Sequence, residues 1–302
     1  MNYRACCWAA AATAVLAVAA CTPEIDTDPV PAVMEFDPTA KPPRVSEPSF
    51  LARDQMTGKI DLGVAGIDVP ADCSTQPALA RAQCEFNQYL ESLDGFPTVA
   101  TARTPVGRST GPPTATVPTN VAVINGITKQ PINQVAVSYD ATARYLVIAP
   151  NRSWPTAGFI WIGVRGYDAG IRVQGKPVVA STTYNLLKRD DSLTCGPATA
   201  ATIPATCGYL QLLSQQMSPD MARASLVTLE LLRTVFTLPQ VGGGGWASLE
   251  AAGIPKAQAV VLWGFPVHSN PVIDLYPPAG LVPQPAGANE IRLAVNLSLI
   301  HI

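Results

Sequence analysis

Apolar residues in the middle of this chain occur as short runs that turn residues interrupt. Between residues 98 and 167 the runs recur at a spacing of about ten residues and are rich in β-branched and aromatic side chains. We predict five strands there, at 98–103, 120–124, 134–138, 145–149 and 159–167. The connections carry turn sequences such as Asn125-Gly126 and Pro150-Asn151. Strands this short and this evenly spaced are typical of an all-β sandwich.

A second pattern, with apolar residues three and four positions apart, predicts helices before and after these strands. A short helix is predicted over 78–93, where Asp94-Gly95 ends it. A longer helix is predicted over 219–236, with Ser218 as its cap and a proline in its first turn. Both segments keep one apolar face, which is the pattern of a helix that packs on a core.

The predicted elements after the long helix return the chain to the sandwich. A short helix is predicted over 247–252, and the apolar run 259–265 predicts a last strand. The domain is therefore expected to be mainly β, an Ig-like sandwich over 51–267. It carries a helical insertion over about 181–253.

The first twenty residues have the pattern of an export signal. Arg4 gives a positive start, and an apolar, alanine-rich segment then runs from Ala5 to Val18. This segment is too short to span a membrane, and proline-rich polar sequence follows it. Its end, Leu16-Ala17-Val18-Ala19-Ala20-Cys21, resembles the lipobox of bacterial lipoproteins, in which the cysteine is lipidated. The alternative is an ordinary secretory signal of residues 1–20 that a cysteine follows by chance.

The resemblance to lipoproteins implies that Cys21 becomes an acylated N-terminus that holds the protein on a membrane. Several acyl chains on one residue give durable anchoring, whereas a single chain binds reversibly. Thr22 follows the cysteine, and by resemblance to enterobacterial sorting patterns this favours the outer membrane of the cell envelope. Residues 21–50 contain many prolines among acidic residues, which predicts an extended, solvated tether.

Four further cysteines predict two local disulfides. Cys73 and Cys84 lie close together in the sequence, and so do Cys195 and Cys207. An exported protein reaches a compartment in which disulfides persist, and we favour these two short loops over the other connectivities that four cysteines allow. A zinc site is the alternative, but the spacing does not suit it and the chain has 2 histidines, both near its C-terminal end.

Composition limits the partners. A net charge of -2 and a charged fraction of 14% leave no basic surface for nucleic acid.

Trp161 and Trp263 lie in predicted strands, so we expect them in the core. Trp154 and Trp246 lie in predicted loops, and they are the better candidates for a surface that binds a protein or glycan partner. Even for these two, burial against the sandwich is favoured over binding.

Part of the strand region follows a pattern seen in a known family. Its features are the strand 145–150, the loop that carries Trp154, the strand end Val164-Arg165-Gly166 and the turn Asp168-Ala169-Gly170. Residues 121–170 thereby resemble the SbsA-type bacterial Ig-like domains of surface proteins. Ile160-Trp161 stands where that pattern usually has Thr-Tyr. The resemblance implies a non-catalytic scaffold or spacer.

Residue patterns for catalysis and for ligand binding are weak. The nearest match to the G-x-S-x-G elbow of serine hydrolases, Gly245-Trp246-Ala247-Ser248-Leu249, lacks the flanking glycines. His268 lies in a predicted linker, and the glycine run 242–245 lacks the Lys-Ser/Thr pair of a phosphate-binding loop. No stretch matches the sequence of a calcium-binding loop. The remaining candidate is a weak calcium site formed by loops from different strands. The aspartates considered for it are Asp140, Asp168, Asp190 and Asp191. We expect no enzyme activity, no metal and no cofactor.

These patterns predict a lipid-anchored Ig-like module that acts as a spacer or binding scaffold. The run 93–98, Leu-Asp-Gly-Phe-Pro-Thr, resembles the entry into the N-terminal region of some bacterial surface lipases. It raises the alternative of a non-catalytic N-terminal part of a longer lipase or esterase. A substrate-binding lipoprotein of a transporter is disfavoured, because the two-lobed α/β pattern is missing.

The C-terminal residues are expected to belong to something other than the sandwich. Residues 272–278 echo the apolar–acidic pattern of 33–38, and two such short patterns can also match by chance. If the repeat is real, 268–302 is a linker and the start of a truncated second module. The last residues, 296–302, resemble a translated sequencing adapter, which favours truncation over a terminal strand.

Overall fold

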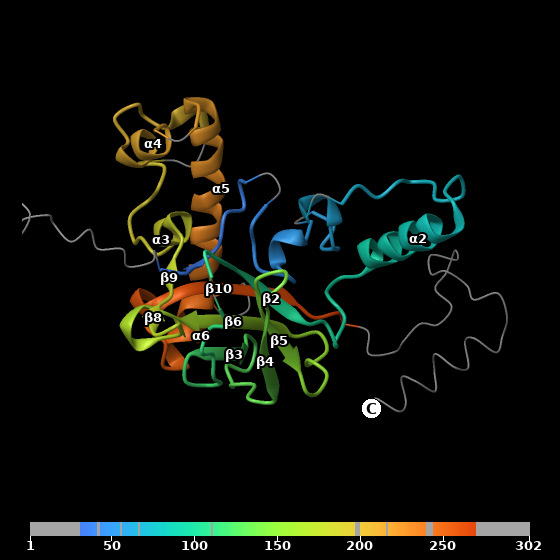
Figure 1. Cartoon of the computed structure of the whole chain (residues 1–302). Helices are drawn as coiled ribbons and strands as arrows, with labels where there is room; N and C mark the ends of the chain where they lie inside the picture. The colour runs from blue at the N-terminus through green and yellow to red at the C-terminus, as the bar shows by residue number, and fades with distance from the viewer. Residues whose placement is uncertain are drawn as a thin grey trace, which may run out of the picture. The chain divides into compact units, whose positions relative to one another are not determined.

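The computed structural model describes residues 31–40, 43–54, 56–65, 67–109, 111–196, 200–215, 217–239 and 244–269 (Figure 1). Sheets form the centre of the fold, as predicted, but helices take up a larger share of the chain than strands do. The signal segment 1–20, Cys21 and residues 270–302 lie outside the described residues. Within the described part, none of the helices is both long enough and apolar enough to cross a membrane.

One sheet has five strands in the order β4-β5-β2-β1-β9. These strands are β4 (Val135–Asp140), β5 (Tyr145–Pro150), β2 (Ala102–Gly107), β1 (Val33–Met34) and β9 (Val179–Ala180). Neighbours are antiparallel except for β1 and β9, which run parallel, so the sheet is mixed. In β4 every second residue is exposed, which is the pattern of a strand with one face on the core.

A second, antiparallel sheet has β6 between β10 and β3 (Figure 1). Its strands are β10 (Ala259–Pro266), β6 (Phe159–Arg165) and β3 (Val121–Asn125). Every residue of β10 is buried, which explains why this strand reads as a continuous apolar run. Ile148 of β5 and Ile162 of β6 belong to one buried cluster, so the two sheets share a core. A small hairpin pairs β7 (Arg172–Val173) with β8 (Lys176–Pro177).

Of the five α-helices in the described part of the chain, four lie between β9 and β10, where the insertion was predicted. They are α3 (Thr182–Leu187), α4 (Gly208–Leu213), α5 (Pro219–Thr237) and α6 (Gly245–Ala251), and α2 (Ala78–Ser92) precedes the strands. Single 3-10 turns are η1 (Phe50–Ala52), η2 (Leu62–Ala65), η3 (Tyr167–Ala169), η4 (Ala200–Thr202) and η5 (Lys256–Gln258). The Ser218 side chain caps α5, as predicted, because its hydroxyl accepts the Met221 N–H.

Aromatic side chains join the helices to the sheets. The ring of Phe236 on α5 has its centroid 6.0 Å from those of Phe50 and Trp161 and 5.7 Å from that of Trp246. Gly245 allows α6 to lie close to β6, because a Cβ atom at this position would be 3.0 Å from ring carbons of Trp161. The helical insertion is therefore part of the main core rather than an appendage.

The prediction of an extended, solvated tether over residues 21–50 is wrong for the residues of this segment that the structure describes. Residues 31–36 enter the five-stranded sheet, where Val33 and Met34 pair with β2 on one side and with β9 on the other. Met34 and Phe36 are buried in the core, and so is Phe50. The physical reason is that the apolar alternation at Met34 and Phe36 buries enough surface to order the segment in spite of its prolines.

Candidate functional site

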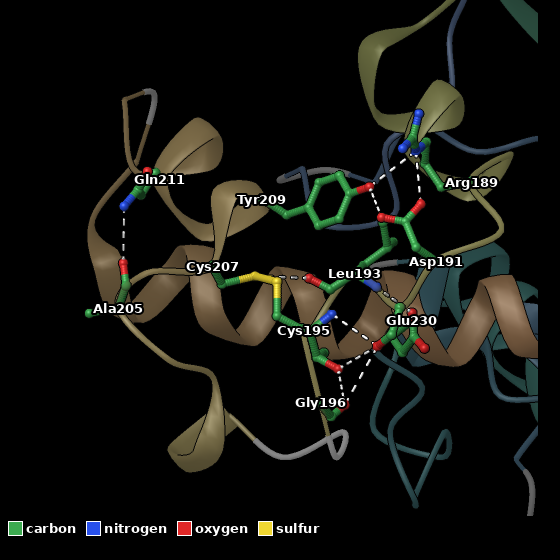
Figure 2. The surroundings of a disulfide bond; sticks show 12 residues. Arg189, Asp191, Leu193, Cys195, Gly196, Ala205, Cys207, Tyr209, Gln211 and Glu230 are labelled. Atoms are coloured by element: carbon green, nitrogen blue, oxygen red, sulfur yellow. Dashed lines mark hydrogen bonds and ion pairs between the residues drawn. A yellow bond between two sulfur atoms is a disulfide. The ribbon is translucent and has the colours of Figure 1, made fainter.

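The disulfide predicted between Cys195 and Cys207 is confirmed, and it joins the turn after α3 to the start of α4 (Figure 2). The two Cα atoms are 5.8 Å apart. Cys195 is exposed, whereas Cys207 is 2% exposed. Cys195 also has a φ of 54°, in the left-handed region that residues with a Cβ atom rarely adopt. The turn therefore holds Cys195 at the surface in a constrained conformation.

A buried ion pair fixes this turn on α5. The Leu193 N–H donates to Glu230 Oε2 at 2.9 Å, and Arg233 donates to the two carboxylate oxygens at 2.8 and 2.7 Å. The hydrogen bonds from Arg233 lower the pKa of Glu230, and together with the Leu193 N–H they outweigh the opposing effect of burial. Glu230 therefore stays charged and anchors the start of the turn.

Arg189, Asp191 and Tyr209 form a closed triangle of hydrogen bonds beside the disulfide (Figure 2). The Tyr209 hydroxyl donates to Asp191 Oδ2 at 2.5 Å, and Arg189 Nε donates to Asp191 Oδ1 at 3.0 Å. The Tyr209 hydrogen bond is the main cause that lowers the pKa of Asp191. Asp190 forms an ion pair with Lys256 at 2.6 Å. Both aspartates are thus occupied by neighbouring donors.

The aspartates that were considered for calcium are not brought together. Asp140 Oδ1 accepts the N–H groups of Thr142 and Ala143, each at 2.9 Å, which is an Asx turn. Asp168 lies in η3. In the part of the chain that the structure describes, no group of three His, Cys, Asp or Glu residues could hold a metal ion.

The second predicted disulfide, between Cys73 and Cys84, is also confirmed. It ties the segment before α2 to the middle of that helix, and both cysteines are buried. Gln88 of the same helix donates to the carbonyl oxygens of Pro70 and Ala71 at 2.6 and 3.1 Å. This segment is therefore stapled to α2 by one covalent bond and two hydrogen bonds.

Asp94, which was predicted only to end a helix, holds the chain where it leaves β10. Its carboxylate pairs with His268 Nδ1 and accepts both the N–H and the hydroxyl of Ser269. Phe96 N–H donates to Pro266 O, and His268 N–H donates to Phe96 O, each at 2.9 Å. Burial raises the pKa of Asp94, but the hydrogen bonds from Ser269 and His268 outweigh it and the pKa is lowered.

Lys129 and Ser248 form a pair with the chemistry of a serine–lysine dyad. Lys129 Nζ donates to Ser248 Oγ at 2.9 Å, and desolvation lowers the pKa of Lys129. A nucleophile needs access to a substrate. Ser248 is 1% exposed, and its hydroxyl donates to Gly244 O at 2.7 Å. In this conformation the pair links two elements instead of presenting a nucleophile.

Trp154 and Trp246 are buried, as favoured, so the alternative that they form a partner surface does not hold. They are 2% and 5% exposed, and their rings pack on Phe265 and Phe236 respectively. Trp154 Nε1 donates to Ala100 O at 2.7 Å, so even its polar atom is bound inside the protein. Trp246 lies in α6 rather than in a loop, whereas the loop of Trp154 is held by a hydrogen bond from the Trp154 backbone N–H to Thr98 O. In both cases burying the indole stabilises the fold more than exposing it would.

Sequence reasoning missed the two polar pairs of Asp94 with His268 and Lys129 with Ser248. They join positions 174 and 119 residues apart, and no local pattern reports such distances. His268 was considered alone, and Ser248 was noted only within the imperfect elbow. Cys21 lies outside the described residues. No protein-family model matches the chain, and no curated protein is significantly similar to it.

Proposed function

We propose that this protein is a non-catalytic module of the bacterial cell envelope, anchored through a lipid on Cys21, which acts as a spacer or binding scaffold. The observation that carries the proposal is the pair of local disulfides, Cys73–Cys84 and Cys195–Cys207. Disulfides persist in exported proteins and are rare in the cytosol. They agree with the export signal and with the lipobox that ends at Cys21.

The packing supports a scaffold. The two sheets and the insertion share one buried core, which suits a module that presents a partner surface away from a membrane. Within this proposal the two sheets form an Ig-like sandwich of the surface-protein type. Its partner is a protein or a glycan, and its membrane is the outer membrane.

The polar clusters support a non-catalytic role. Ser269 bonds to the Asp94 carboxylate, as His268 does, so this serine has no imidazole to take its proton. Ser248 is buried, and its hydroxyl is bound to a carbonyl oxygen. Both arrangements stabilise chain positions and leave no activated nucleophile.

Lipidation tests the proposal directly. The wild-type protein and the Cys21→Ala variant are expressed in a bacterium grown with labelled palmitate, and Cys7→Ala serves as the control within the signal segment. We expect label on the wild type and the control and none on Cys21→Ala, which leaves the membrane fraction or stays unprocessed. Label on Cys21→Ala, or a processed form of that variant that stays in the membrane fraction, would overturn the proposal.

A second candidate is the non-catalytic N-terminal part of a longer surface lipase or esterase. It is favoured by the hydrogen bonds that join residues 94–96 to residues 266–269 at the end of β10. These bonds fix the direction in which the chain would enter a following domain. Long-read sequencing of the locus beyond the codon for Asn296 tests it. A continuous frame with a G-x-S-x-G motif would establish this candidate, and a stop or further Ig-like modules would refute it.

A further inference from the structure

The two disulfides differ in how far their cysteine residues are exposed. Cys73 and Cys84 are both buried, whereas Cys195 is exposed and only its partner Cys207 is buried. Thiol–disulfide exchange requires a thiolate to reach one sulfur in line with the bond that breaks. Burial hinders this approach at Cys73, Cys84 and Cys207, whereas Cys195 is the exposed residue of the two pairs.

The turn that carries Cys195 is held in place by bonds that do not involve the disulfide. Leu193 and Thr194 are buried, and the Leu193 N–H is bound to Glu230. The Thr194 hydroxyl donates to Gly196 O at 2.7 Å, which closes the turn around Cys195. The left-handed φ of Cys195 is therefore imposed by its surroundings.

The other side of the bond is anchored as well. Cys207 N–H donates to Pro204 O at 2.9 Å. Ile203, Leu210 and Leu213 are buried on either side of it. Both halves thus keep their own contacts to the core when the S–S bond opens, so the bond can open and close without unfolding the domain.

We propose that Cys195–Cys207 is a thiol-exchange site whose substrate is the dithiol of a Cys-x-x-Cys oxidoreductase, whereas Cys73–Cys84 is a permanent staple. A thiolate of the dithiol attacks Cys195 Sγ, the S–S bond breaks, and Cys207 leaves as a thiolate that takes a proton from water. The second thiol of the oxidoreductase, as a thiolate, then attacks the mixed disulfide and releases Cys195. The protein disulfide gains two electrons and two protons, and the dithiol is oxidised to a disulfide.

A reduction series on the folded protein tests this assignment. The purified protein is treated with increasing dithiothreitol, alkylated with N-ethylmaleimide and digested with trypsin, and the peptides are analysed by mass spectrometry. We expect Cys195 and Cys207 to be labelled at a dithiothreitol concentration at least about tenfold lower than Cys73 and Cys84. Equal or reversed labelling, or labelling of Cys195 and Cys207 only in urea, would overturn the proposal.

Two matched variants separate accessibility from stability. Cys207→Ala leaves the Cys195 thiol without its partner, and Cys84→Ala does the same for Cys73. We expect the thiol of Cys195 to react with Ellman's reagent at least about tenfold faster than that of Cys73 while circular dichroism stays native. Equal rates would contradict the proposal, and if a variant does not fold, the reduction series on the wild type still decides. The reduction series assigns each labelled cysteine to its peptide, so its result does not depend on lipidation at Cys21 and stands or falls apart from the proposed function.

Discussion

Lys129 Nζ donates a hydrogen bond of 2.9 Å to Ser248 Oγ and thereby joins the turn after β3 to α6. The two residues are 119 positions apart in the chain. The Ser248 hydroxyl in turn donates a hydrogen bond to Gly244 O at the start of the helix, so Lys129 is linked through Ser248 to this backbone carbonyl. Lys129 has a φ of 62°, so its turn adopts a conformation that residues with a Cβ atom rarely accept unless the surroundings impose it.

The Ser248→Ala variant tests how much this link stabilises the fold. It removes the acceptor of Lys129 and the donor to Gly244, and we expect the free energy of unfolding to fall by about 1–2 kcal/mol. Urea denaturation followed by circular dichroism measures it. Ser138→Ala on the exposed face of β4 is the control, and we expect it to change stability by less than about 0.5 kcal/mol. Equal stability of the two variants would contradict the structural role of the pair.

Glu230 makes stability depend on pH in the acid range. Its pKa is lowered in the folded protein, chiefly by Arg233, so its contribution is present above the unfolded value of about 4.3 and is lost as pH falls through the folded value. We expect Glu230→Gln to lower the free energy of unfolding at pH 7 by about 2 kcal/mol. At pH 3 the difference between variant and wild type should be smaller.

Urea denaturation at pH 7 and at pH 3 measures both effects of the Glu230 substitution. Glu250→Gln is the matched control, because Glu250 is an exposed carboxylate on α6. We expect this control to behave like the wild type at both values of pH. A difference for Glu230→Gln that does not shrink at pH 3 would show that the charge of Glu230 is not what stabilises the turn.

The burial of the tryptophans can be tested in solution. Trp154, Trp161, Trp246 and Trp263 are all buried, so iodide should quench their fluorescence weakly. The Trp8→Phe variant removes the one further tryptophan, which lies outside the described residues. We expect the quenching constant of this variant to rise several-fold in urea. Strong quenching in native buffer would contradict this burial and favour the alternative that Trp154 and Trp246 lie on a partner surface.

Local patterns in the sequence predicted the local structure well. The helix predicted over 219–236 is α5, and the strands predicted at 145–149 and 159–167 are β5 and β6 with small differences at their ends. The two disulfides were predictable because each closes a short loop. In each case the deciding signal lies within about twenty residues of chain, which is the range over which periodicity and turn chemistry act.

Interactions between distant parts of the chain could not be predicted in this way. Strand β1 contains only Val33 and Met34, too few residues for alternation to stand out among prolines, and it is ordered by its neighbours β2 and β9. The role of Asp94 depends on His268, 174 residues later. Burial of Trp154 was favoured, but its partners Ala100 and Phe265 are distant in the chain and could not be predicted.

The contact between residues 94–96 and the end of β10 requires a glycine at position 95. A Cβ atom on Gly95 would lie 2.6 Å from the Val267 carbonyl carbon and 2.7 Å from the His268 nitrogen, and both are backbone atoms that cannot rotate away. We expect Gly95→Ala to lower the free energy of unfolding by about 1–3 kcal/mol and to speed hydrogen exchange of the His268 amide. Gly208→Ala, with nothing within 4 Å of the added Cβ, is the control. Unchanged exchange at His268 in Gly95→Ala would mean that this contact does not hold the end of β10.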